Sequence, residues 1–186
     1  MLRRKNQRAA EEEKKEEGGA PVTNAQKKSP AELRLKKEYA ELDLPPHATV
    51  SFPKEGDLMK INVQIDLTKE TDSRWKGGKY LFTITFSNSY PYEAPKCHCE
   101  TPIYHPNIDT DGNVCLNILR ADWKPVLGVN PVILGLIFLF IEPNPNDPLN
   151  HEAARVLRDN PHMFTQNVNR SLQGGTVDGI SYPRMK

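Results

Sequence analysis

The stretch between residues 101 and 129 holds the residues best suited to chemistry. It contains a His-Pro-Asn tripeptide at 105–107 and, a short loop later, Cys115 in a polar context. The stretch shows neither helical nor strand periodicity, and irregular segments of this length inside compact domains are usually functional. Most isolated cysteines are small buried hydrophobic residues, but a thiol in a polar loop is open to acyl transfer. We therefore predict that Cys115 is a nucleophile.

Asn107 has two interpretations that the residues alone leave open. Its amide N–H groups could stabilise the negative charge of a tetrahedral intermediate, and removing such a donor typically slows a reaction by ~10²–10³. An Asn in an irregular loop also commonly braces the backbone through hydrogen bonds.

Two rival sites are disfavoured by spacing. Cys97, His98 and Cys99 could be drawn as zinc ligands together with His105, but the paired C-x₂₋₄-C spacing of many zinc sites is missing. Alternate residues of a strand share one face, so the two cysteines fit a buried strand face instead. A Cys–His hydrolase would need a base and an orienting group aimed at Cys115, and no such signature surrounds it. We expect no metal and no cofactor.

The first element that positions this loop is a helix with a well-marked start. Ser29 is a good N-cap, Pro30 suits the first helical position, and Glu32 completes a capping box. The helix is expected to run until the Pro-Pro pair at 45–46 stops it.

Strands and then further helices follow this first helix. Alternation of apolar and polar residues predicts a four-strand antiparallel meander with short connections. The predicted strands cover residues 50–52, 61–67, 80–86 and 96–100. Periodicity and capping residues then predict three helices. These cover residues 131–141, 150–159 and 161–172. A helix, a run of strands and a run of helices define an α+β fold.

Charge divides the 186-residue chain into a tail and a core. Residues 1–28 hold eight Lys/Arg and five Asp/Glu, a net charge of +3, while the remainder has a net charge of −2. We predict a disordered basic tail over 1–28, either a solubilising segment or a docking peptide, and a single core domain over 29–186. The nearly neutral core disfavours nucleic-acid binding, which needs concentrated basic charge.

Cysteine usage and hydropathy indicate the compartment. Three cysteines at spacings that suit no disulfide framework, and no apolar leader-like stretch at the start, predict a reducing compartment, the cytosol and nucleus. The longest apolar run, residues 132–141, is about half of the ~20 residues that a membrane span needs. We expect no membrane crossing.

Several linked motifs occur in a fixed order. Besides His-Pro-Asn and the following Cys, the chain has Trp-x-Pro at 123–125, Tyr-Pro-x-x-x-Pro at 90–95 and Glu-Pro-Asn-Pro-Asn-Asp-Pro-Leu at 142–149. In these motifs, and in the order of its predicted elements, the chain resembles the ubiquitin-conjugating enzyme family from about Ser29 to the C-terminus. His-Pro-Asn alone would be a weak signal, but the combination is specific.

The resemblance implies an activity and roles for four residues. It implies that Cys115 carries a modifier as a thioester on the modifier's C-terminal Gly, and that His105 braces the loop instead of acting as a base. Asp147 matches the carboxylate at the channel edge, which could orient an attacking Lys, although it could also form an Asx turn. Asn117 stands where ubiquitin-dedicated members commonly carry Asp, and we assign it a loop-supporting role.

The details look most like the conjugating enzymes of neddylation, which pass a ubiquitin-like modifier to cullins. That branch usually begins with a short apolar and aromatic motif, whereas residues 1–5 here offer only Leu2 after Met and no aromatic residue. This departure weakens the expected docking role of the tail, in which Leu2 would be the anchor. The alternatives are transfer of ubiquitin itself and a non-catalytic scaffold that binds modifiers.

The resemblance also implies protein partners. It places the activating enzyme on the first helix, at Arg34, Lys36 and Lys37. It places a RING-type ligase on two rigid loops, at Pro91, Tyr92, Lys124 and Pro125. Exposed proline and aromatic residues on rigid loops are suitable anchors, although they could equally serve loop packing. The modifier is bound covalently, a cullin is the substrate, and the enzyme is expected to be a monomer.

Overall fold

The computed structural model describes residues 28–185, and its first element is helix α2, Pro30–Ala40. The Ser29 side chain accepts a hydrogen bond from the Glu32 N–H, and the Glu32 carboxylate accepts one from the Ser29 N–H, so the predicted capping box is present. The helix ends at Ala40, before the Pro-Pro pair that was expected to stop it. Leu42 and Leu44 leave the helix and pack against the core, so tertiary burial ends it early.

The predicted meander is present as a four-strand antiparallel sheet in the order β1-β2-β3-β4. The strands are β1 (Ala48–Ser51), β2 (Lys60–Asp66), β3 (Lys79–Thr85) and β4 (Lys96–Cys99). Val63 lies opposite Phe82, and both side chains are fully buried on the inner face. The alternation that predicted the strands therefore also sets their register, because a slip of one residue would expose the apolar set.

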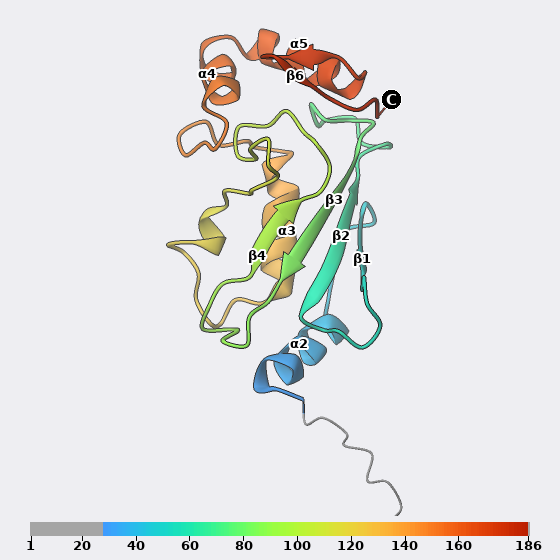
Figure 1. Ribbon diagram of the computed structural model, residues 1–186, viewed down its shortest axis with the longest axis vertical. Coiled ribbons are helices and arrows are strands. Elements are labelled where there is room, and N and C mark those ends of the chain that lie inside the picture. Colours follow the sequence, from blue (N-terminus) through green and yellow to red (C-terminus); the bar gives the residue numbers. More distant parts are fainter. Residues whose placement is uncertain (1–27, 186) are drawn as a thin grey trace, which may run out of the picture.

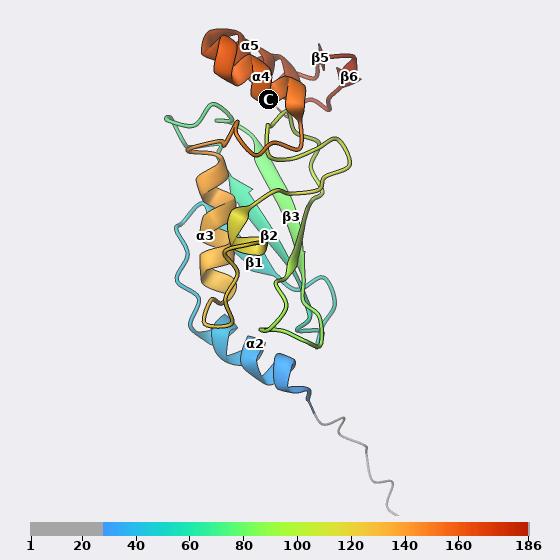
Figure 2. The ribbon, with the colours of Figure 1, turned by 90° about the vertical axis from the view of Figure 1, so that its left-hand side faces the viewer.

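Helix α3, Val129–Leu139, crosses the inner face of the sheet (Figures 1 and 2). Its sequence is almost entirely apolar, and six of its residues are buried, among them Val132, Ile133 and Leu136. The helix begins two residues before the predicted start and ends two residues before the predicted end. The core therefore lies between α3 and the sheet.

The C-terminal helices gather at the end of the molecule opposite α2 (Figures 1 and 2). Helix α4 covers His151–Asp159 and α5 covers Pro161–Leu172, and each begins after an Asn whose side chain caps it. A small hairpin that we did not predict follows, with strands β5 (Thr176–Val177) and β6 (Ile180–Ser181). No helix within residues 28–185 has the length and apolarity to cross a bilayer.

Candidate active site

Cys115 lies at the junction of the irregular loop and a short 3-10 helix, η1 (Asn117–Leu119). Its backbone N–H donates to the carbonyl oxygen of Asn107 at 2.8 Å, which joins the two predicted residues directly. The thiol borders a pocket of about 220 Å³. The pocket is lined by Asn107, Cys115, Leu116, Asn117, Ile118, Phe138, Leu139, Glu142, Asn144 and Asp147. Three predicted site residues besides Cys115 therefore line one cavity.

The Cys115 thiol donates a hydrogen bond to Asp147 Oδ2, at 3.1 Å. Burial raises the pKa of the Cys115 thiol to about 11, and the hydrogen bond to Asp147 adds to the rise because a carboxylate disfavours a nearby thiolate. Arg120, whose Nη1 lies 3.9 Å from Asp147 Oδ2, acts in the opposite direction. The free enzyme thus holds Cys115 as a protonated thiol.

The Asn107 side chain is buried, and both of its polar atoms form hydrogen bonds to the backbone. Its Nδ2 donates to the carbonyl oxygens of Asn144 at 2.7 Å and Asp147 at 3.1 Å, and its Oδ1 accepts from the Asn144 N–H at 2.8 Å. These bonds span 37 to 40 residues of sequence. In this conformation Asn107 braces the segment that carries Asp147, and a role as oxyanion donor would require it to release a carbonyl.

His105 lies under the loop, fully buried and stacked on Trp75 with ring centroids 4.5 Å apart. Its Nε2 lies 3.0 Å from the Leu139 carbonyl oxygen, which can only accept, and its Nδ1 accepts from the Asn107 N–H at 2.9 Å. These partners fix the neutral tautomer with the proton on Nε2. Burial lowers the pKa of His105 to about 4. Both ring nitrogens are occupied, so the residue is a brace in this structure.

The segment that leads to Cys115 is fastened to the edge of the sheet. The Cys99 N–H donates to the Gly112 carbonyl at 2.8 Å, and His98 pairs with Asn113 in an isolated bridge. Gly112 has φ +83°, and a Cβ there would collide with the Cys99 carbonyl oxygen. Glycine is therefore required at 112, for both its backbone conformation and its lack of a side chain.

The potential zinc ligands have other partners. The Cys99 thiol donates to the Thr101 carbonyl at 3.2 Å, and burial raises the pKa of both Cys97 and Cys99 to about 12. Within residues 28–185, no three His, Cys, Asp or Glu side chains are placed to hold a metal ion. The two cysteines thus behave as strand residues.

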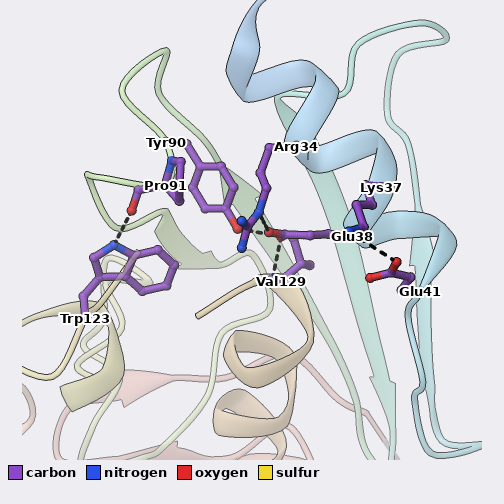
Figure 3. A network of polar contacts seen from close by, with 8 residues as sticks. All are labelled: Arg34, Lys37, Glu38, Glu41, Tyr90, Pro91, Trp123 and Val129. Carbon is purple, nitrogen blue, oxygen red and sulfur yellow. Dashed lines mark hydrogen bonds and ion pairs between the residues drawn. The ribbon is translucent and has the colours of Figure 1, made fainter. Parts of the chain in front are cut away.

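The residues predicted to bind partners lie outside the Cys115 pocket. On α2, Lys36 is exposed, Arg34 forms an ion pair with Glu38, and Lys37 lies 4.0 Å from Glu41 (Figure 3). Leu2 is outside the described residues.

The two loops assigned to a ligase are fastened to each other. Trp123 Nε1 donates to the Pro91 carbonyl at 2.8 Å, which joins the loop that holds Pro91 and Tyr92 to the loop that holds Lys124 and Pro125 (Figure 3). Tyr92 is 83% exposed. Lys124 and Pro125, which follow Trp123 in the sequence, are also exposed. The surface that these loops present is accessible to a partner.

Three structural residues escaped sequence analysis. Glu38 lies near the start of α3, and its Oε2 accepts from the Tyr90 hydroxyl at 2.6 Å and the Val129 N–H at 3.0 Å (Figure 3). Asn144 lies in the motif at 142–149, but the motif does not reveal its contact with Asn107. The sequence likewise does not reveal that Arg120 lies near Asp147. Their partners are far away along the chain, so no local pattern could reveal them.

The fold and site correspond to a known family. The model of the family described as "Ubiquitin-conjugating enzyme" matches residues 34–172, most of the described core. The chain belongs to this family. It is therefore an acyltransferase that works through a cysteine thioester.

Similar proteins within the ubiquitin-conjugating enzyme family carry names that refer to NEDD8 or Ubc12. The chain is 53% identical to "Probable NEDD8-conjugating enzyme Ubc12-like" of Arabidopsis thaliana, over 89% of each chain. It is 47% identical to "Nedd8-conjugating enzyme UbcE2M" of Drosophila melanogaster, over 82% of each. The solved structure of S. cerevisiae Ubc12 matches with a TM-score of 0.76 and 37% identity, covering 98% of this chain and 96% of the other.

Proposed function

We propose that this chain is a NEDD8-conjugating enzyme that accepts the modifier as a thioester on Cys115 and transfers it to a substrate lysine. The assignment of the modifier is supported by the names of relatives that are about half identical along most of the chain. The assignment of the site is carried by one observation, the hydrogen bond from the Cys115 thiol to Asp147 at the pocket. The nearby imidazole of His105 cannot act as a base, because both of its nitrogens form hydrogen bonds to the backbone. A scaffold that only binds modifiers would not need the pair of Cys115 and Asp147.

In the first step the modifier moves from the activating enzyme to Cys115. The thiol proton leaves, the Cys115 sulfur attacks the thioester carbonyl, and the thiolate of the activating enzyme departs. Because the resting pKa of Cys115 is raised, deprotonation has to accompany docking, when the activating enzyme changes the surroundings of the thiol. The free enzyme is consequently a poor nucleophile toward other electrophiles.

In the second step a neutral lysine amine attacks the thioester carbonyl, a C–N bond forms and the C–S bond breaks. The proton lost by the amine ends on the departing sulfur, so Cys115 is restored as a thiol. Once the thioester has formed, Asp147 no longer accepts the thiol proton, and its carboxylate lies within hydrogen-bond reach of the space beside the sulfur. The carboxylate can accept a hydrogen bond from the N–H of the entering lysine and so orient the amine. Among the described residues no His lines the Cys115 pocket, and this would protect the thioester from activated water.

Partner roles beyond the modifier and the activating enzyme extend this proposal. We assign a RING-type ligase to the joined loops at Pro91, Tyr92, Lys124 and Pro125, and a cullin as substrate. The activating enzyme would meet α2, with the segment 1–28 and its Leu2 as an additional docking peptide. Work in the cytosol and nucleus agrees with three unpaired thiols.

A charging assay tests the proposal. The protein is incubated with ATP and with either the NEDD8-activating enzyme plus NEDD8 or the ubiquitin-activating enzyme plus ubiquitin, and products are run with and without thiol. We expect a thiol-sensitive adduct with NEDD8 and much less with ubiquitin. Preferential charging with ubiquitin would contradict the choice of modifier.

Substitutions locate the thioester. Cys115→Ser should give an ester that resists thiol, because a hydroxyl replaces the sulfur, while Cys97→Ser and Cys99→Ser should charge normally and serve as controls. A thiol-sensitive adduct on the Cys115→Ser protein would show that another cysteine carries the modifier.

A further inference from the structure

A second pocket has a volume of about 240 Å³. Part of its lining begins two residues after Asp147, the last residue that lines the Cys115 pocket. The second pocket is formed by the loop after Asn107, the start of α4 and the β5–β6 turn. Its polar lining includes Tyr104, Asp109, Asn150, Glu152, Asp178 and Tyr182. The backbone N–H groups of Leu149 and Asn150 both donate to the Pro106 carbonyl, at 2.9 and 3.0 Å, so this pocket and the Cys115 site share one backbone support.

One short backbone segment borders both pockets. Asp147 borders the Cys115 pocket and Asn150 borders the second one. Three peptide units separate these residues, so their Cα atoms lie at most ~11 Å apart. An extended peptide covers about 3.3 Å per residue. A residue about three positions from a target lysine can therefore reach the second pocket while that lysine is at Cys115.

Three carboxylates line the pocket, and they differ in what they already bind. Asp109 accepts hydrogen bonds from the backbone N–H groups of Asp111 and Asn113, and Glu152 forms an ion pair with Arg155. Asp178 forms no ion pair within residues 28–185, although its negative charge helps to raise the pKa of Arg155. It lies in the β5–β6 turn with φ +51°. Asp178 also interacts with the Tyr104 hydroxyl through a hydrogen bond, so it is a carboxylate without a counter-ion that lies beside a phenol.

Two tyrosines complete the lining, and one has an unmet hydrogen bond. Tyr104 and Tyr182 meet edge to face with centroids 6.5 Å apart, and Tyr104 accepts from Asn167 Nδ2 at 3.3 Å. Tyr182 is only 6% exposed, and its hydroxyl is a buried polar atom without a partner among the described residues. Burial raises the pKa of both phenols to about 12, and the Asp178 charge contributes. An unpaired buried hydroxyl is unfavourable, and a ligand group that hydrogen-bonds to it would remove that penalty.

We propose that this pocket binds a basic side chain, Lys or Arg, of the acceptor protein, about three residues from the lysine that is modified. The cation would pair with Asp178, donate to a phenol oxygen, and lie against the aromatic rings. An acidic side chain would be repelled by three carboxylates, and an apolar one would leave Asp178 without a counter-ion and the Tyr182 hydroxyl without a partner. The inference rests on the proposed function, because it assumes that the chain modifies lysines of proteins.

Single-turnover discharge of the purified thioester tests this site. The acceptors are a peptide with one lysine and an Arg three residues away, the same peptide with Gln in place of Arg, and free lysine. We expect the Arg peptide to have a KM lower by about twofold to fivefold than the Gln peptide, the range of a partly screened ion pair. The difference should shrink with added salt.

Variants connect the preference to the pocket. Asp178→Asn removes the charge, and Asn tolerates the positive φ of this position, so the fold is retained. It should abolish most of the difference between the peptides and leave discharge to free lysine unchanged. Tyr182→Phe should reduce the difference partially without loss of stability. Asp72→Asn, an exposed aspartate outside the pocket, should change nothing.

Equal KM values for the two peptides with the wild-type enzyme, or an undiminished preference in Asp178→Asn, would overturn the site. The thioester is made with whichever modifier the enzyme accepts. A failure of the NEDD8 assignment would therefore appear in the charging step, whereas a failure of this inference appears only in the comparison of peptides.

Discussion

Two polar networks hold distant segments of this protein together, and they use opposite chemistry. Around Cys115, the neutral side chains of Asn107 and His105 bind backbone groups from three segments. At α2, the Glu38 carboxylate binds Arg34, the Tyr90 hydroxyl and the first N–H of α3 (Figure 3). One network is uncharged and the other is built on an ion.

The difference follows from what each region must do. A free base beside the proposed thioester would promote its hydrolysis, so the Cys115 region is braced by neutral side chains whose polar atoms are occupied, and the Asp147 carboxylate is bound by the thiol in the resting protein. Near α2 no such risk exists, and a carboxylate is the better partner for the exposed N–H groups of a helix start. Gly128, the N-cap of α3, has no side chain for this purpose, and Glu38 supplies the missing cap from another helix.

The largest effect is expected from breaking the neutral network. Asn107→Ala removes three partly buried hydrogen bonds and leaves the carbonyls of Asn144 and Asp147 without their donor, so the free energy of unfolding should fall by about 3–4 kcal/mol. Calorimetry checks this value, and Asn113→Ala, which loses one exposed side-chain bond, is the control. The remaining folded protein should charge but discharge slowly, because the segment that carries Asp147 is released. An unchanged melting temperature with slow discharge would instead make Asn107 an oxyanion donor.

Breaking the ionic network should have a somewhat smaller effect. Glu38→Ala uncaps α3 and leaves the Tyr90 hydroxyl and Val129 N–H without their acceptor, for a loss of about 2–3 kcal/mol measured by urea unfolding. Glu38→Gln keeps one acceptor oxygen and should lose less. Glu41→Ala, at an exposed ion pair on the same helix, should lose under about 0.5 kcal/mol. Equal losses for Glu38→Ala and Glu41→Ala would refute the capping role.

Acid should distinguish the networks. The pKa of His105 is about 4 in the fold and about 6.5 in the unfolded chain, so below pH 6.5 the unfolded state binds more protons. Stability should therefore fall by about 2 kcal/mol between pH 7 and pH 5. His105→Gln should be less stable at pH 7 but should lack this contribution to the slope. A wild-type slope in that variant would assign the acid sensitivity to other groups.

The smallest effect concerns the carboxylate at the thiol. Asp147→Asn removes the charge that helps to raise the Cys115 pKa, so alkylation of Cys115 at pH 8–9, followed by mass spectrometry, should become faster. Discharge to lysine should slow about tenfold, or ~1.4 kcal/mol, because the amine loses its orienting partner. Charging should be little altered. Discharge at the wild-type rate would remove Asp147 from the proposed mechanism.

Local signals predicted the elements, and long-range contacts determined where they end. The Ser29 capping box and the β2–β3 alternation are written within a few residues, so both were found. The end of α2 depends on Leu42 and Leu44 reaching the core, which no neighbouring residue announces. The β5–β6 hairpin had a signal, since Asp178 is followed by Gly179 and both have positive φ, but strands of two residues show no periodicity.

The site could be foreseen as a set of residues but not as a geometry. Cys115 and Asn107 are eight residues apart in one loop, and their context marked them. The occupation of every polar atom of Asn107 depends on a segment about 40 residues further on, so sequence alone left brace and donor open. The tautomer of His105 likewise depends on the backbone carbonyl of Leu139, whereas the sequence shows only that the Leu139 side chain is hydrophobic.

The fastening of the loop to β4 protects the protein from aggregation. β4 is an edge strand of the sheet, and edge strands expose unpaired N–H and C=O groups on which another chain can build. Gly112 and Asn113 cover part of that edge. Peptide cleavage or a bulky residue at 112 would lift the loop, disturb Cys115 and open the edge together. Loss of activity and loss of solubility would then arise from the same lesion.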